Sequence, residues 1–252
     1  MLLARRYGRR CPACASDIHL KTTTLPWVFH CPVHGLKLQA AAGGSLADTL
    51  GAEQMPRLEV PAKAGAALLA AWSSGAEQNG LGPVEMLALL TTRHRRASPP
   101  SVNEQPRMSL QTRRDYHEFL TTPIARQALT VVVPEYDEVV PVLAKPVRPG
   151  LYGLAQGSLL QDFALTVGIG RIVENPVALA IAELLASDTD GQGRVQEALR
   201  SWPLSLRRRI SARLWRAQRD DRDRLIAEKA TRRRQSHKYR YVQSHDYRSG
   251  NS

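Results

Sequence analysis

Cysteine is scarce in this sequence, with three in 252 residues, all of them among the first 31. So small and odd a number excludes a disulfide framework and is typical of a reducing compartment. No apolar run reaches the roughly 18 residues that cross a bilayer, and Arg5 and Arg6 stand where a secretory signal needs apolar residues. We therefore expect a cytoplasmic protein with no membrane segment. Seventeen glycines and 16 prolines also exclude a collagen-like chain.

Motifs of catalysis are also missing. The sequence has no phosphate-binding loop, no HExxH and no GxSxG. Its histidines are scattered, and its carboxylates are not clustered as in a two-metal nuclease. A nucleophile would therefore lack a neighbouring base. These absences predict a protein that is not an enzyme.

Acidic residues are too few to balance the basic ones, and the formal net charge is +12. The excess lies mostly in one segment, because Ser205 to Arg240 contains 14 Lys and Arg against 4 Asp and Glu. A basic arm of this kind favours polyanionic partners such as nucleic acid. The residues before it are nearly neutral and are better suited to contact with protein.

The three cysteines are present in a metal-binding pattern, C-x2-C-x16-C-x2-H, formed by Cys11, Cys14, Cys31 and His34. Two-residue gaps turn both ligands of a pair toward one ion, and four ligands close a tetrahedral shell that suits a structural Zn²⁺. His30 and His19 are alternative ligands, although only His34 repeats the spacing of the first pair. Buried free thiols and a redox CxxC are the other readings, but a redox pair usually opens a helix in a βαβ unit.

These residues resemble the zinc finger of the TniQ family. The similarity covers Cys11-Pro-Ala-Cys14 and the stretch from Leu25-Pro26-Trp27 through Cys31-Pro-Val-His34-Gly35 to Leu38, with weaker similarity at Thr122 to Thr130 and Leu199 to Pro203. The resemblance implies a bacterial, nucleoid-associated protein that selects transposition targets, binds DNA and contacts an AAA+ ATPase regulator. Only ten residues precede Cys11 and no cysteine pair follows His34, which implies a short or diverged member.

The remaining sequence predicts a mainly α fold. We expect a zinc ribbon or knuckle finger at 1–40, a helical lobe at 56–96, a linker at 97–107, a second lobe at 108–202 and a basic helix with a disordered tail at 203–252. Helical spacing and proline positions favour helices at 62–72, 82–90, 113–120, 123–133, 177–185 and 193–200. The β-branched runs at 130–133 and 139–142 fit a short hairpin equally well.

The second lobe contains a candidate helix-turn-helix. Ala164, Gly168 and the apolar Ile169 have the spacing of the tight corner between its two helices. Residues 170–180 would then form the recognition helix, presenting side chains to bases, namely Arg171, Glu174 and Asn175. An ordinary pair of core helices joined at Gly168 is the alternative.

The basic arm contributes the other candidate nucleic-acid contacts. We expect one long helix from Pro203, with an apolar stripe of Leu206, Ile210 and Leu214. Its predicted contacts are basic residues that would bind phosphates and a tyrosine that would stack on bases, namely Arg207, Arg208, Arg209, Arg232, Arg233, Arg234, Lys238 and Tyr239. A solvated tail is the alternative. For the whole protein, the alternative is a zinc-stabilised nucleic-acid-binding or protein-interaction module of a mobile element or phage, with no role in transposition.

Overall fold

The computed structural model describes residues 9–14, 21–40, 46–76, 80–94, 127–139 and 147–246, with side chains up to Arg232. The chain forms two compact units, Met1–Arg207 and Arg208–Ser252. The fold is mainly helical, as the sequence predicts. The expected helices at 113–120 and the linker at 97–107 lie outside the described residues.

The elements follow the helix boundaries that proline and polar residues indicate in the sequence. Pro83 and Pro176 stand at the first positions of their helices, where a missing N–H costs nothing. The strands are β1 (Arg9–Arg10) and β2 (Gln39–Ala40), with a 3-10 helix at Lys21–Thr24. The helices are α1 (Leu46–Leu50), α2 (Met55–Ser73), α3 (Pro83–Leu90), α5 (Leu129–Val132), α6 (Pro134–Val139), α7 (Leu151–Gln156), α8 (Leu159–Glu174), α9 (Pro176–Ala186), α10 (Thr189–Leu199) and α11 (Leu204–Asp246).

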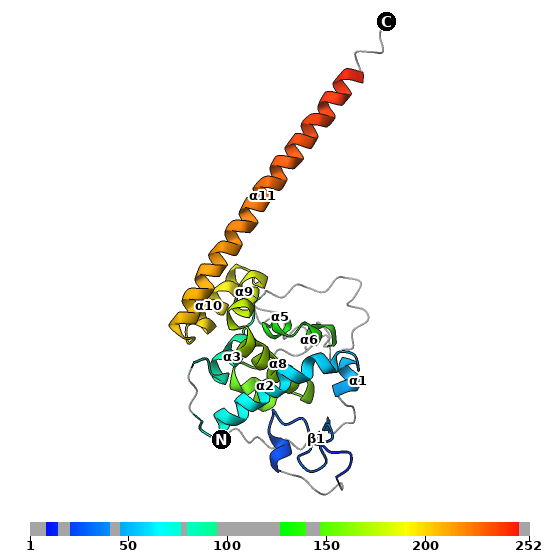
Figure 1. Cartoon of the computed structure of the whole chain (residues 1–252), viewed down its shortest axis with the longest axis vertical. Coiled ribbons are helices and arrows are strands. Elements are labelled where there is room, and N and C mark those ends of the chain that lie inside the picture. Colours follow the sequence, from blue (N-terminus) through cyan, green and yellow to red (C-terminus); the bar gives the residue numbers. More distant parts are fainter. Residues whose placement is uncertain are drawn as a thin grey trace, which may run out of the picture. The chain divides into compact units, whose positions relative to one another are not determined.

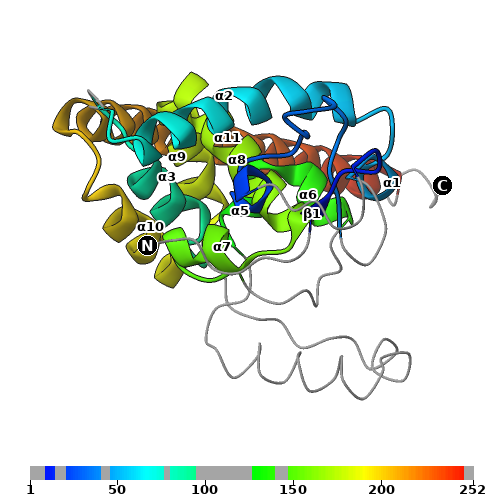
Figure 2. The same ribbon diagram turned by 90° about the horizontal axis from the view of Figure 1, so that it is seen from below.

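The core of the first unit is built around α8, which lies alongside α2 in Figures 1 and 2. Two glycines let their backbones touch. A Cβ placed on Gly65 would lie 2.0 Å from the carbonyl oxygen of Thr166, and one on Gly170 would lie 2.0 Å from that of Pro61. Glycine is therefore required at both positions by the closeness of the two helices.

The predicted corner at Gly168 is wrong, because Gly168 lies inside the continuous helix α8. A Cβ on Gly168 would lie 2.8 Å from the side chain of Leu90 in α3. The glycine spacing thus serves close helix packing instead of a turn. The chain bends by 116° at Asn175, between α8 and α9.

The segments expected as two lobes share one core. Helices α2 and α3 pack against α8, and α3 also packs against α10. Thr91, which we expected in an exposed connection, is buried, and its hydroxyl accepts a hydrogen bond from the Gly150 N–H at 2.7 Å. Residues 129–139 form helices α5 and α6 and no hairpin, because Leu129, Val132 and Val133 are buried against the helical core.

No helix in the described ranges is both long and apolar enough to span a bilayer by itself. Together, α8 and α9 have the necessary length and composition, but they are bent by 116° and α8 is largely buried in the core.

Helix α9 brings one carboxyl group into the core. Glu183 is completely buried, and neither of its carboxylate oxygens has a hydrogen-bond partner in the described part of the chain. Burial raises the pKa of Glu183 to about 9, since the charged form is poorly solvated there. The side chain is therefore protonated in the folded protein at neutral pH.

We expect Glu183 to make the protein less stable as the pH rises. Its pKa is about 9 in the folded state against 4.5 ordinarily, so its contribution is complete below pH 4.5 and is lost as the pH rises toward 9. The loss reaches at most about 1.4 kcal/mol per pH unit. Urea unfolding across this range should show a smaller pH slope for Glu183→Gln than for the wild type. The exposed Glu174→Gln should keep the wild-type slope, and a wild-type slope in Glu183→Gln would contradict the assignment.

Candidate metal centre and basic helix

Two tight turns present the cysteines and the histidine. In the first, the Cys14 N–H donates to the Cys11 carbonyl at 3.2 Å. In the second, the Gly35 N–H donates to the Cys31 carbonyl at 2.8 Å, and Gly35 has a φ of +65° that favours glycine. Strands β1 and β2 pair antiparallel beside these turns and hold them together.

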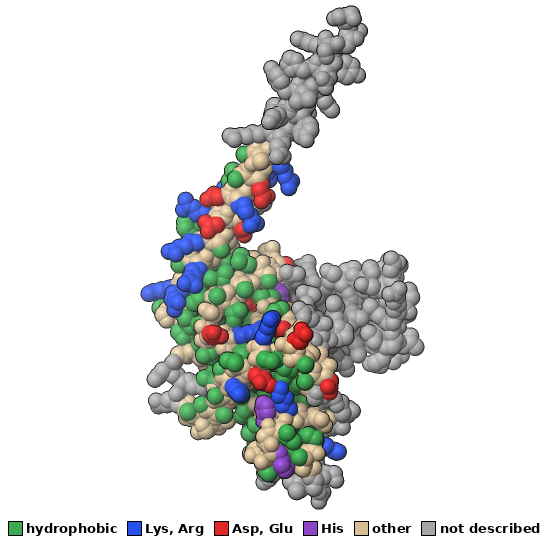
Figure 3. Space-filling view, turned by 45° about the vertical axis from the view of Figure 1, so that its right-hand side comes forward, with side chains coloured by type: hydrophobic (Ala, Val, Ile, Leu, Met, Phe, Trp, Pro, Cys, Tyr) green, Lys and Arg blue, Asp and Glu red, His purple; other side chains and the backbone are tan. Residues whose placement is uncertain are grey.

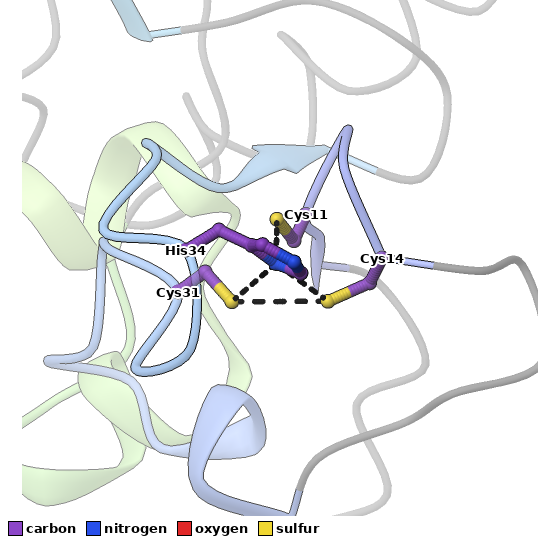
Figure 4. A group of neighbouring side chains, drawn as sticks. All are labelled: Cys11, Cys14, Cys31 and His34. Carbon is purple, nitrogen blue, oxygen red and sulfur yellow. Dashed lines mark hydrogen bonds between the residues drawn. The ribbon is translucent and has the colours of Figure 1, made fainter.

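The four predicted ligands converge on one point, with every pair of ligand atoms within 4.8 Å. Nδ1 of His34 lies 3.6, 3.4 and 3.7 Å from the sulfurs of Cys11, Cys14 and Cys31, and the sulfurs of Cys14 and Cys31 are 3.8 Å apart. Figure 4 shows the side chains pointing toward one another from the two turns. The cluster can hold a metal ion. His30 is not part of it, and His19 lies outside the described residues.

The charges of the sulfurs are set by their surroundings. Backbone N–H groups, first that of His34 and then that of Val33, lower the pKa of Cys31 to about 6. Burial and the neighbouring sulfurs of Cys31 and Cys11 raise the pKa of Cys14 to about 11. Three thiolates this close repel one another, so a bound cation would stabilise all of them in the charged form.

Arg9 anchors the finger (residues 9–40) to the helical core. The buried guanidinium donates through Nη1 to the carbonyls of Leu25, Pro26 and Val28 at 3.0, 3.1 and 2.8 Å. Its Nη2 forms an ion pair with Asp162 of α8, which is completely buried. One side chain thus joins the first strand, the loop before the second turn and the central helix.

Aromatic and surface contacts complete this attachment. The rings of Phe29 and Phe163 meet edge to face with centroids 5.1 Å apart, and the Arg9 guanidinium lies 5.2 Å from the Phe29 centroid. Lys37 of the finger forms an ion pair with Glu59 of α2. Sequence reasoning missed Arg9 and Asp162, because nothing in the sequence links two residues 153 positions apart.

Compared with known proteins, the chain matches no family model, no curated protein and no solved structure. The similarity to the TniQ finger therefore depends on the residues of the two turns and the loop between them.

Arg171 and Asn175, predicted to read bases, do not form a recognition helix. Both terminal nitrogens of Arg171 donate to Glu135, at 2.9 and 2.7 Å, and Nη1 also donates to the Val132 carbonyl at 2.8 Å. This arginine ties α8 to α5 and α6. Asn175 lies at the bend between α8 and α9, exposed at the surface. The helix that follows presents apolar side chains, such as Leu185, where base-reading groups would be needed.

Helix α11 confirms the long helix expected after Pro203. Figure 3 shows basic side chains along its described part with acidic ones among them. The acidic residues pair within the helix, at 4.0 Å for Arg219 with Asp223 and at 3.5 and 3.8 Å for Arg224 with Asp221 and Glu228. Arg219 also lies 5.5 Å from the ring centroid of the exposed Trp215. This middle part of α11 is therefore largely self-neutralised.

The first part of α11 is different, since no acidic residue occurs from Leu204 to Gln218. Arg208, Arg209, Arg213 and Arg216 are exposed, whereas Arg207 is half-buried. Arg209, Arg213 and Arg216 are spaced at i, i+4 and i+7, which places them on one face of the helix. We had not singled out Arg213 and Arg216, although this spacing is visible in the sequence. The backbone is helical through Asp246, but the side chains of Arg233, Arg234, Lys238 and Tyr239 lie outside the described part of the chain.

Proposed function

We propose that Cys11, Cys14, Cys31 and His34 hold a structural zinc ion. A tetrahedral zinc ion with bonds of about 2.3 Å to sulfur and about 2.0 Å to nitrogen has sulfur–sulfur edges of about 3.8 Å and sulfur–nitrogen edges of about 3.5 Å. The observed edges of 3.8 Å and of 3.4 to 3.7 Å support this metal. Three soft thiolates also favour zinc over magnesium or calcium.

The chemistry of this site is structural. Four protein ligands leave no coordination position for a water or a substrate, so the bound ion would supply folding energy to a segment with little core of its own. The only completely buried apolar side chain of the finger is Leu38, among the residues that the structure describes. The ion would hold the two turns together and thereby position Arg9 and Phe29 against α8.

We further propose that the protein is a TniQ-like, DNA-binding adaptor in transposition target selection that bridges DNA and an AAA+ ATPase regulator. The observation that carries DNA binding is the unpaired arginine face at the start of α11. Arg209 and Arg216 are separated by about 10 Å along the helix axis, at about 1.5 Å per residue, so three guanidinium groups can reach successive phosphates of one strand. The adaptor role is supported by the residues shared with the TniQ finger.

The transposition role has its own test. The protein and an AAA+ ATPase encoded next to it should copurify, and the complex should direct an integrase-type transposase to a preferred site. The lack of a cysteine pair after His34 favours the second candidate, a zinc-stabilised nucleic-acid-binding module with no role in transposition. DNA binding without any ATPase contact would support that candidate instead.

The arginine face predicts a specific loss of salt-dependent binding. The triple variant Arg209→Ala/Arg213→Ala/Arg216→Ala should bind a short duplex more weakly and reduce the log–log salt slope by about 2 to 3, since each phosphate contact contributes about 0.9. Fluorescence anisotropy at several salt concentrations measures both quantities. All duplex sequences should lose affinity alike, because phosphate contacts carry no direct sequence information.

The control removes the same amount of charge elsewhere. Arg200, Arg219 and Arg224 are exposed and ion-paired with nearby carboxylates, so replacing all three with alanine should reduce the slope by less than about 1. Equal losses in the two triple variants would mean that only the total charge matters and that the face has no special role.

A further inference from the structure

An apolar pocket lies where the finger meets α1, α2 and α8. Its floor consists of the aromatic and aliphatic side chains Trp27, Phe29, Leu46, Met55 and Phe163. Its volume of about 70 Å³ is well below the several hundred Å³ of a typical cofactor pocket. The pocket therefore has the size for a single apolar side chain.

The rim of the pocket is basic. Lys37 and Lys63 lie there with His30, and Glu59 is the carboxylate among them. Glu59 forms an ion pair with Lys37, whereas Lys63 is exposed and pairs with no acidic side chain among the described residues. The rim thus retains one uncompensated positive charge beside an apolar floor.

We propose that this pocket binds a partner protein through an apolar side chain that is flanked by acidic residues. An aliphatic or aromatic anchor fills the floor, and a neighbouring carboxylate pairs with Lys63, which follows the usual combination of a buried anchor and a charged rim. Nucleic acid fits less well, because the floor lacks polar groups that could read a base edge and Glu59 would repel phosphate.

The pocket depends on the attachment of the finger. Trp27, Phe29 and Lys37 come from the finger, while Met55 and Lys63 come from α2. Separating these elements would divide the anchor site between two surfaces. Partner binding is therefore coupled to metal binding, and this inference is independent of the proposed DNA contact on α11.

Labelled acidic peptides with one central leucine, methionine or phenylalanine test the proposal by fluorescence anisotropy on the full chain. At least one should bind at least about tenfold more tightly than the same peptide with a central serine or with lysines in place of the acids. Lys63→Glu should weaken this binding at least about tenfold, and Ala66→Phe, which fills the pocket from its wall, should abolish it. Lys229→Glu, the same charge change on α11, should leave it unchanged.

Folding and competition keep the test decisive. Metal content and far-ultraviolet circular dichroism should be the same in Lys63→Glu, Ala66→Phe and Lys229→Glu, and chelation should abolish peptide binding. Equal binding of the serine and apolar peptides would overturn the proposal. Displacement of the peptide by duplex DNA, in wild type and in the triple arginine variant alike, would assign the site to nucleic acid instead.

Discussion

Cys14→Ser should release the metal ion and unfold the finger, residues 9–40. A serine hydroxyl is a poor ligand for a soft ion, and the remaining three ligands cannot close the shell. The effect should be large, because zinc contributes about 10 to 16 kcal/mol of binding free energy in zinc-finger peptides near neutral pH. Elemental analysis should find one zinc per chain in the wild type and none in the variant. Limited proteolysis should cut the variant within the finger.

Val33→Ser is the matched control for this result. Val33 lies in the second turn and is 66% exposed, and its side chain offers no ligand atom. The variant should therefore retain the ion and resist proteolysis as the wild type does. Full zinc retention in Cys11→Ser/Cys14→Ser would contradict the assignment, as would wild-type protein that contains no zinc when it is purified without chelator.

Asp162→Ala should destabilise the first unit by about 3 to 5 kcal/mol, the cost of leaving one partner of a buried ion pair behind. Arg9 would keep its three carbonyl acceptors but lose its only described counter-charge. Urea unfolding measures the change in the free energy of unfolding. Faster proteolysis of the finger with the ion still bound would show that the lost contact is its attachment to α8.

Two further variants separate the ion pair from a general effect of losing an acid. Asp220→Ala removes an exposed carboxylate from α11 and should change the free energy of unfolding by less than about 0.5 kcal/mol. Arg9→Met/Asp162→Leu removes both charges and should be more stable than Asp162→Ala, because apolar groups can replace a buried pair. If the double variant is less stable than Asp162→Ala, Arg9 stabilises the fold mainly through its carbonyl contacts.

Local patterns in the sequence determined the metal ligands and several helices. Cys11, Cys14, Cys31 and His34 could be found because both turns are short and their ligand spacing is dictated by the geometry of one ion. The helix at 177–185 and the one after Pro203 could be found because proline, polar caps and apolar periodicity act within a few residues. The arginine face of α11 follows from the helical repeat once the helix is known.

Only the tertiary structure decided the roles of residues whose partners are distant in the chain. Gly168 has the spacing of a turn but lies within a helix, because Leu90 and α2 press against this part of α8. Arg171 resembles a base-reading side chain, yet Glu135 binds both of its terminal nitrogens. Arg9 belongs to a basic segment and is nevertheless buried against Asp162. A charge or a glycine has the same appearance in the sequence whether its partner is solvent, DNA or another helix, and packing alone selects among them.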